Sequence, residues 1–296
     1  MPEIRIDPLT GLRAIVATEL GELGGEELAI ATVAGFDIAG DPFVEEHAGG
    51  ALRHDARQPE PDSHPALYMA LAARGAHELI VNTPRSVSSL ADLSVDELQG
   101  AVDIWRARMR AQEEAAYVHL GVDEGLEAVA AHPQSHAQLY ALDYVPAAVA
   151  RERERFSAHA MRTMGGNLLE DLIQEEVRRR VRIVAIDDEA VLSCPYASQH
   201  EFQLMLTPRR RRDRFEAEGP SGAALLHDAL SRLRRHFGAG PPLSLWVRTA
   251  PRDAERFCWR IDIVPRLRRR GSLELGSGTH VNTVAPEQAA AELREA

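Results

Sequence analysis

A histidine and a glutamine two positions apart are the residues best suited to chemistry in this sequence. They lie in HPQSHAQLYA, residues 132–141, whose alternation predicts a strand over 136–142. Side chains alternate between the faces of a strand, so His136, Gln138 and Tyr140 share one face and the small apolar residues between them fill the other. An imidazole held there can attack phosphorus and form a phosphoramidate, and a neighbouring amide can donate to a phosphate oxygen. The pattern indicates His136 as a nucleophile and Gln138 as its partner.

A buried structural histidine is the alternative interpretation of His136. A lone histidine on a strand often bonds a backbone carbonyl and has no chemical role. The preceding turn of His, Pro and Ser and the following Gln138 favour chemistry. The two cysteines, Cys194 and Cys258, are far apart and form no CxxC motif, so we expect neither a disulfide framework nor a cysteine metal site.

The elements that must position His136 occur twice along the chain. Each set is a strand, a helix and two further strands, and Ser94 with Glu97 has the spacing of a capping box at the first helix. The first set is expected at 75–84, from 94 onwards, at 117–122 and at 136–142, and the second at 202–206, 220–237, 243–247 and 257–264.

A constant offset relates the two sets. The tripeptide Thr-Pro-Arg occurs at 83–85 and at 207–209, an offset of 207 − 83 = 124, and the same offset carries His136 to Arg260 in the matching strand. The sequence therefore predicts an α+β chain of two similar halves, 1–155 and 156–296, each an antiparallel sheet with packed helices. The segment 40–64 has no apolar period and is expected to be a loop.

The segment QSHAQ, residues 134–138, resembles the His-x-His-x-Gln signature of galactose-1-phosphate uridylyltransferases, a branch of the histidine-triad superfamily. Further similarity covers most of the chain except about 40–64. It is carried by residues 7–10, 77–81, 89–93, 257–265 and 282–294. The resemblance implies two histidine-triad-like halves, the first of which holds the nucleophile.

The same resemblance implies roles for individual residues. The second histidine of the signature, here His136, takes the uridylyl group from a UDP-sugar and passes it to a hexose 1-phosphate, and Gln138 contacts the phosphoryl group. The remaining residues expected at the substrate are Gln134, Ser135, Asp123, Glu274 and Asn282. For Glu274 and Asn282, ordinary polar residues of a glycine-rich turn and strand are an equal alternative. The implied partners are a nucleotide sugar, a sugar phosphate and a second copy of the chain in a homodimer.

Most metal ligands of the family are replaced here. The zinc positions hold Asp41, Val44, Ser86 and Gln134, and those of a second metal hold Glu152, Arg248, Arg260 and Asp262. Zinc needs about four N, S or O ligands, and two arginines would repel a cation. We therefore expect no metal and no other cofactor. The two arginines could clamp a phosphate or carboxylate, but the balance of charges favours a buried ion network with Glu152 and Asp262.

Acidic residues replace two further family features. The arginines that grip phosphate after the first strand correspond to Glu19–Glu22 here, and an Asn-x-Gly segment corresponds to Asp123–Gly125. Carboxylates close to a diphosphate weaken its binding through like-charge repulsion. These replacements favour a changed substrate or a non-catalytic relative.

The overall charge argues against two classes of partner. The 296 residues carry a net charge of −11, which repels nucleic acid and anionic membranes. No stretch approaches the ~18 apolar residues of a membrane span, and the first residues lack an apolar leader. We expect a cytoplasmic protein that binds neither nucleic acid nor membrane.

Three functions are compatible with these residues. The first is a metal-free nucleotidyltransferase that uses a UDP-sugar or another nucleotide sugar through a covalent His136 intermediate. The second is a nucleotide or phosphoramidate hydrolase, in which water takes the nucleotidyl group from His136. The third is a non-catalytic nucleotide-binding or structural relative.

Overall fold

The computed structural model describes residues 3–6, 8, 13–16, 44–46, 51–128, 130 and 134–296. Its main feature is a nine-stranded sheet in the order β3-β5-β7-β6-β11-β12-β10-β9-β8, in which all neighbouring strands pair antiparallel. The strands are β3 (Val44–Glu46), β5 (Gly75–Val81), β6 (Tyr117–Glu124), β7 (His136–Leu142), β8 (Ile183–Ile186), β9 (Ala190–Ser193), β10 (Leu204–Pro208), β11 (Leu243–Arg248) and β12 (Arg260–Pro265).

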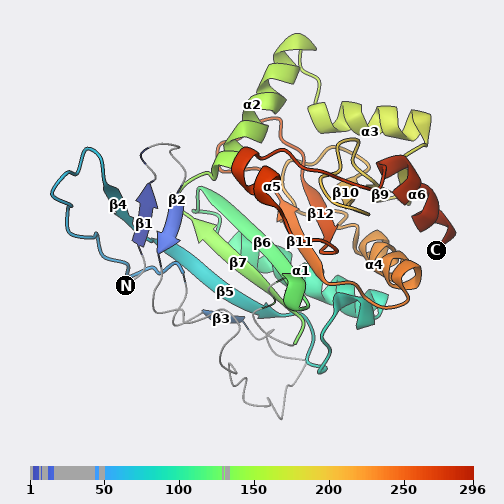
Figure 1. Ribbon diagram of the computed structural model, residues 1–296, viewed down its shortest axis with the longest axis horizontal. Coiled ribbons are helices and arrows are strands. Elements are labelled where there is room, and N and C mark those ends of the chain that lie inside the picture. Colours follow the sequence, from blue (N-terminus) through green and yellow to red (C-terminus); the bar gives the residue numbers. More distant parts are fainter. Residues whose placement is uncertain are drawn as a thin grey trace.

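A small sheet and six α-helices complete the fold (Figure 1). The small sheet has the order β2-β1-β4, from β2 (Arg13–Val16), β1 (Glu3–Ile6) and β4 (Met69–Ala72). The helices are α1 (Val95–Ala111), α2 (Ala147–Arg162), α3 (Leu168–Arg179), α4 (Ala223–Phe237), α5 (Ser272–Ser277) and α6 (Pro286–Glu295). The expected α+β class with antiparallel sheets and packed helices is confirmed. No helix in the described parts of the chain is long and apolar enough to cross a membrane.

The expected two sheets are joined into one. The strands β5-β7-β6 are followed across the β6–β11 pair by β11-β12-β10, so the same three-strand arrangement occurs on both sides of that pair. Gly121 pairs with Trp246 at this junction. Arg260 begins β12 just as His136 begins β7. The boundary between the halves at 155 and 156 stays a prediction.

The Thr-Pro-Arg repeat gave an offset that carries the start of β7 to the start of β12, but the two tripeptides themselves differ in position. Thr83 lies beyond the end of β5 at Val81, whereas Thr207 and Pro208 lie within β10. The strand β10 extends into its tripeptide, whereas β5 ends before its own. The two tripeptides are therefore not at equivalent positions.

The apolar face of the sheet packs against α1 and α4, which bury the main core. Ala137, Leu139 and Ala141 of β7 are buried there, together with Trp105 of α1. The Trp105 indole donates to Asn82 Oδ1 at 2.9 Å, so the largest core side chain is tied to the loop that follows β5. The predicted capping box of Ser94 and Glu97 is present at the start of α1.

Two sequence expectations differ from the structure. The segment 40–64 contains the short strand β3, which pairs with β5 and is too short to show a period. The helix α3 was not predicted, although Asn167 caps it and Leu169 and Ile173 bury one face. Its apolar residues form one stripe, and six of its 12 residues are charged.

Candidate active site

His136 is fixed by a hydrogen bond to the backbone just before it. The side chain is buried, and its Nδ1 lies 2.7 Å from the carbonyl oxygen of Gln134. A carbonyl oxygen only accepts, so Nδ1 carries the ring proton and the lone pair of the neutral imidazole is on Nε2. A backbone carbonyl partner was predicted by the structural alternative for this histidine. The bond itself gives the ring the tautomer that a nucleophile requires.

The turn before His136 is held by side-chain hydrogen bonds to the loop after β5. Gln134 Nε2 donates to the carbonyl oxygens of Thr83 at 3.0 Å and Arg85 at 3.2 Å. Ser135 accepts from Asn82 at 3.0 Å and donates to Glu124 at 3.3 Å. Gln134 and Ser135, predicted to bind substrate, thus have structural bonds in the turn.

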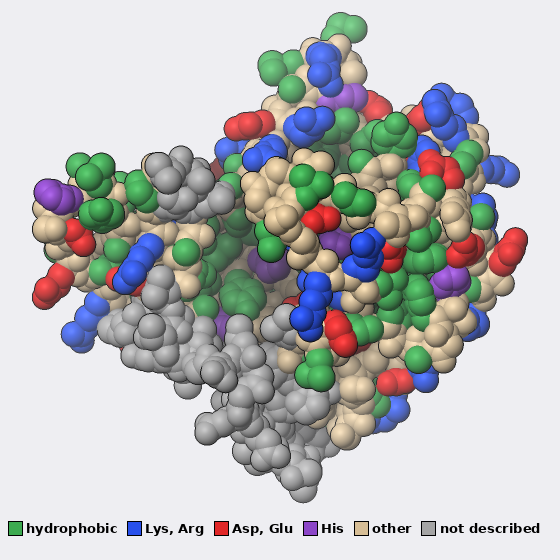
Figure 2. All heavy atoms as spheres, viewed as in Figure 1, with side chains coloured by type: hydrophobic (Ala, Val, Ile, Leu, Met, Phe, Trp, Pro, Cys, Tyr) green, Lys and Arg blue, Asp and Glu red, His purple; other side chains and the backbone are tan. Residues whose placement is uncertain are grey.

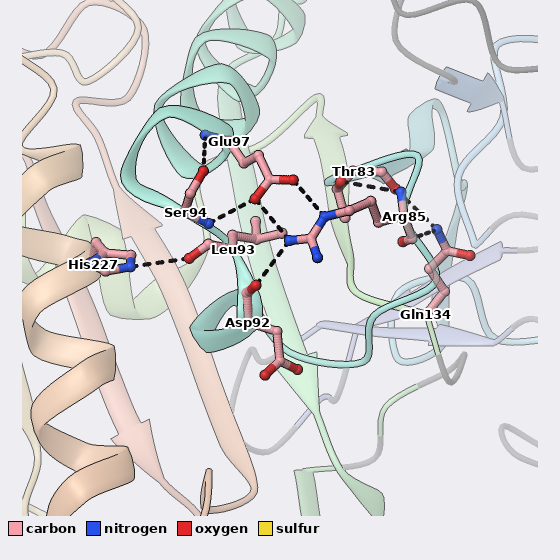
Figure 3. A network of polar contacts seen from close by, with 8 residues as sticks. All are labelled: Thr83, Arg85, Asp92, Leu93, Ser94, Glu97, Gln134 and His227. Atoms are coloured by element: carbon pink, nitrogen blue, oxygen red, sulfur yellow. Dashed lines mark hydrogen bonds and ion pairs between the residues drawn. The ribbon is translucent and has the colours of Figure 1, made fainter.

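Arg85 connects this turn to the start of α1 (Figure 3). Its guanidinium donates to both carboxylate oxygens of Glu97, at 2.6 and 2.8 Å, and to the Asp92 carbonyl oxygen at 2.9 Å. Glu97 also accepts from the Ser94 backbone N–H at 2.8 Å. These bonds lower the pKa of Glu97 to about 2, and the bond from Arg85 contributes more than the bond from Ser94.

Two side chains converge on the amide oxygen of Gln138. Tyr140 donates to Oε1 at 2.8 Å, and His77 Nε2 lies 3.1 Å from the same atom. The rings of His77 and Tyr140 are stacked, with centroids 4.2 Å apart. They face the side of the sheet opposite α1, where Figure 2 shows a hollow with histidine and hydrophobic side chains inside it.

The neighbouring strand β6 adds a neutral histidine and a carboxylate to this face. Burial, with a smaller contribution from Arg248, lowers the pKa of His119 to about 4, so the ring is neutral at pH 7. Asp123 accepts from Ser244 at 2.7 Å, and burial raises its pKa. Gly121 lies between these two residues along β6 and opposite Gln138 on β7, and the His119 side chain lies beside it.

The arginines at the former metal positions form the ion network that the charge balance predicted. Arg260 contacts Glu152 at 2.5 Å and Asp262 at 2.9 Å, and Arg248 lies 3.5 Å from Glu152. Burial opposes ionisation of Glu152, but Arg260 and Arg248 outweigh it and lower its pKa. The guanidinium groups occupy the carboxylates, so this residue set does not fit a metal cation.

The zinc positions also do not fit a metal in the residues that can be described. Ser86 is exposed and Gln134 uses its amide nitrogen in the turn. Asp41 lies outside the described residues, as do Glu19 and Glu22, and only the backbone of Val44 is described. Within the described parts of the chain, no three His, Cys, Asp or Glu side chains are grouped as metal ligands.

Glu274 and Asn282 lie in the C-terminal segment and make local bonds. Glu274 accepts from the Gly271 backbone N–H at 2.9 Å at the start of α5. Asn282 donates to the carbonyl oxygens of Ser198 and His200, each at 3.1 Å. None of the bonds described for them reaches His136 or Gln138, so their role at the substrate stays a prediction.

His77 is the site residue that the sequence did not reveal. It shares a strand with Leu79 and Val81 on the same face, a pattern typical of an ordinary half-buried strand. Its contact with Gln138 depends on the β5–β7 register, in which His77 is opposite Tyr140. A cross-strand register of this kind has no local sequence signal.

Comparison with known proteins gives a consistent likeness to galactose-1-phosphate uridylyltransferases. The model of the family described as galactose-1-phosphate uridyl transferase, N-terminal domain, matches residues 40–146. The galactose-1-phosphate uridylyltransferase of Haemophilus influenzae is 24% identical over 219 residues, which are 72% of this chain and 62% of that protein.

Two solved structures share the fold. A structure titled as a uridylyltransferase superposes with a TM-score of 0.87 at 21% identity and covers 99% of this chain and 97% of its own. An ADP-glucose phosphorylase from Arabidopsis thaliana, solved with bound ADP-glucose, gives a TM-score of 0.69 at 21% identity, with 76% of this chain and 74% of that chain covered.

The fold and the segment around the signature strand are similar to those of uridylyltransferases. The similarity to the galactose-1-phosphate uridylyltransferase family is carried by residues 40–146 in the family model and by relatives that are 24% and 28% identical. The chain spans less than two thirds of the Haemophilus relative, 62% of that protein's length.

The stabilising effect of Glu97 should depend on pH. Its pKa is lowered from 4.5 to about 2, so its stabilisation is complete above pH 4.5 and is lost as pH falls through about 2. We expect Glu97→Gln to lower Tm at pH 7 and the difference from wild type to disappear near pH 2. Thermal unfolding across this range tests it, with Glu154→Gln, an exposed helix position, as control. A pH-independent difference would contradict it.

Neutralising Glu152 should destabilise the protein through Arg260. Breaking a buried pair costs about 3–5 kcal/mol. Because the Glu152 side chain is 26% exposed, we expect Glu152→Gln to lower the free energy of unfolding by about 2 kcal/mol. Urea unfolding measures this, and Glu154→Gln on the same helix is the matched control. An effect equal to that of the control would be evidence against a stabilising network.

The purified protein should contain no stoichiometric zinc or iron. The physical reason is that neither family ligand set is retained and that two arginines replace ligands of the second. Elemental analysis after dialysis measures the metal content directly. About one metal ion per chain would overturn the expectation.

Proposed function

We propose that this protein is a nucleotidyltransferase that acts on a nucleotide sugar and a sugar phosphate through a covalent nucleotidyl-His136 intermediate. The observation that carries the proposal is the bond from His136 Nδ1 to the Gln134 carbonyl oxygen. It fixes the neutral ring with its lone pair on Nε2, on a rigid strand. Such rigidity supports attack because a positioned nucleophile avoids much of the entropic cost of a bimolecular step.

The first step is attack of Nε2 on the α-phosphorus of the nucleotide sugar. The N–P bond forms while the P–O bond to the sugar phosphate breaks, and the sugar 1-phosphate leaves with the electron pair. The proton on Nδ1 remains on the ring, which now carries a positive charge next to the Gln134 carbonyl oxygen. No proton has to be transferred, which suits a site whose neighbouring His119 is neutral.

The second step reverses the first with a new acceptor. A phosphate oxygen of the acceptor attacks the same phosphorus, the N–P bond breaks and its electron pair returns to Nε2. In both steps negative charge accumulates on the non-bridging oxygens. An amide N–H of Gln138 directed at them would stabilise the transition state by about 10²-fold in rate, as donors of the oxyanion-hole kind do.

Only analogy with the relatives suggests which nucleotide base the donor carries and which acceptor the protein uses. The Haemophilus relative is named for uridylyl transfer and the Arabidopsis relative for ADP-glucose, so both nucleotides belong in a test. The buried carboxylate of Asp123 on the same face is a specific reason to keep a changed substrate open. We propose a homodimer and a cytoplasmic location by family analogy alone.

Replacing His136 should abolish covalent labelling and turnover while the fold is kept. We expect wild type, incubated with UDP-glucose or ADP-glucose, to gain the mass of one nucleotidyl group, stable in alkali as a phosphoramidate is, and His136→Ala or His136→Asn to gain none. Intact mass spectrometry is the measurement. Gln138→Ala should slow labelling by about 10²-fold.

The controls are His119→Asn, the exposed His64→Asn and His132→Asn, none of which should prevent labelling. Adding galactose 1-phosphate, inorganic phosphate or neither separates transfer from hydrolysis. Label retained by His136→Ala would place the nucleophile elsewhere. No label on wild type with either nucleotide sugar would favour the non-catalytic relative.

A further inference from the structure

The amide of Gln138 has two possible orientations with opposite chemical effects. With the nitrogen directed at a phosphoryl group it donates, and with the oxygen there it repels the phosphate charge. The two ends have nearly the same shape, so packing alone does not choose between them. The choice depends on the hydrogen bonds around the amide.

Tyr140 does not settle the choice. Its hydroxyl lies 2.8 Å from Gln138 Oε1, but a hydroxyl rotates and serves an amide as donor or acceptor. Burial raises the pKa of Tyr140 to about 12, so the phenol keeps its proton and both roles stay available to it. Tyr140 would accommodate either end of the amide.

His77 settles the choice because the backbone fixes its tautomer. The Ala51 backbone N–H lies 3.3 Å from His77 Nδ1, and an N–H requires an acceptor. The lone pair of the neutral ring is therefore on Nδ1 and the proton is on Nε2. That Nε2–H is 3.1 Å from Gln138 Oε1 and only donates, so it favours the oxygen end of the amide, which accepts, and disfavours the nitrogen end.

We propose that His77 is a positioning residue that orients the Gln138 amide so that its nitrogen is presented to the phosphoryl group bound at His136. The role rests on the proposed nucleotidyl transfer. The hydrogen bonds run in one direction, from Ala51 N–H to His77 and from His77 to Gln138 Oε1. In the described part of the chain, Gln138 Nε2 has no hydrogen-bond partner, so it is available to a ligand.

A double-mutant cycle tests the route through Gln138. We expect His77→Leu to slow formation of the nucleotidyl adduct from UDP-glucose or ADP-glucose by about fivefold, with little change in KM. The effect stays below the ~10²-fold of Gln138→Ala, because the phosphate itself still favours the amide nitrogen. In the Gln138→Ala background, His77→Leu should have no further effect. His77→Gln restores a donor and should recover most of the rate.

His119→Leu is the matched control. It removes another histidine from the same row of the sheet, with its ring centroid 6.3 Å from that of Tyr140, and no bond from it to Gln138 is formed. We expect any change in rate from it to be the same in both Gln138 backgrounds. Thermal unfolding of every variant checks that the fold is kept, since a purely structural loss would slow both backgrounds equally.

The tautomer is measured independently of activity. Nitrogen-15 NMR of the histidine rings at pH 7 should show His77 neutral, with the proton on Nε2. A proton on Nδ1, or equal slowing by His77→Leu in both Gln138 backgrounds, overturns the positioning role alone. Absence of any adduct on wild type overturns the proposed function and this role together, so the two failures are distinguishable.

Discussion

The site depends on one hydrogen bond, between His136 Nδ1 and the carbonyl oxygen two residues before it. This bond determines which ring nitrogen has the lone pair, and it exists only while the turn at 134–135 keeps its shape. The bonds from Gln134, Ser135 and Arg85 all act on that turn or on the loop it contacts. They connect the nucleophile to the capped start of α1, so the tautomer of one ring depends on contacts from three elements.

Hydrogen bonds connect the two segments in which the family places zinc ligands. By resemblance, two of those ligands would come from positions 86 and 134, one in the loop after β5 and one in the signature turn. Here the Gln134 amide reaches the carbonyl oxygens of Thr83 and Arg85 in that same loop. These hydrogen bonds join the same two segments that a zinc ion would join, and each is weaker than a metal–ligand bond. The ion pair of Arg85 with Glu97 holds the loop from its other side.

The sequence predicted the strands and residues with a local pattern and missed those that depend on register. The strand His136–Leu142, the capping box at Ser94 and the buried face of α1 each follow from short-range spacing, and the structure has all three. The joining of two sheets through β6 and β11, and the contact of His77 with Gln138, require knowing which residues face each other across strands. Charge balance predicted the network around Arg260, because a buried arginine needs carboxylate partners wherever they come from.

The two sides of the sheet differ in whether the residue that begins the equivalent strand could act as the proposed nucleophile. Arg260 begins β12 as His136 begins β7, but a guanidinium stays protonated and has no lone pair to offer. Its carboxylate partners stabilise the charged state of the guanidinium. Burial opposes the charge, but Asp262 and Glu152 outweigh burial and raise the pKa of Arg260. At His136, by contrast, the ring Nδ1–H donates to the neutral carbonyl oxygen of Gln134, which fixes the position of the proton. The same strand position thus holds a structural cation in one half and the proposed nucleophile in the other.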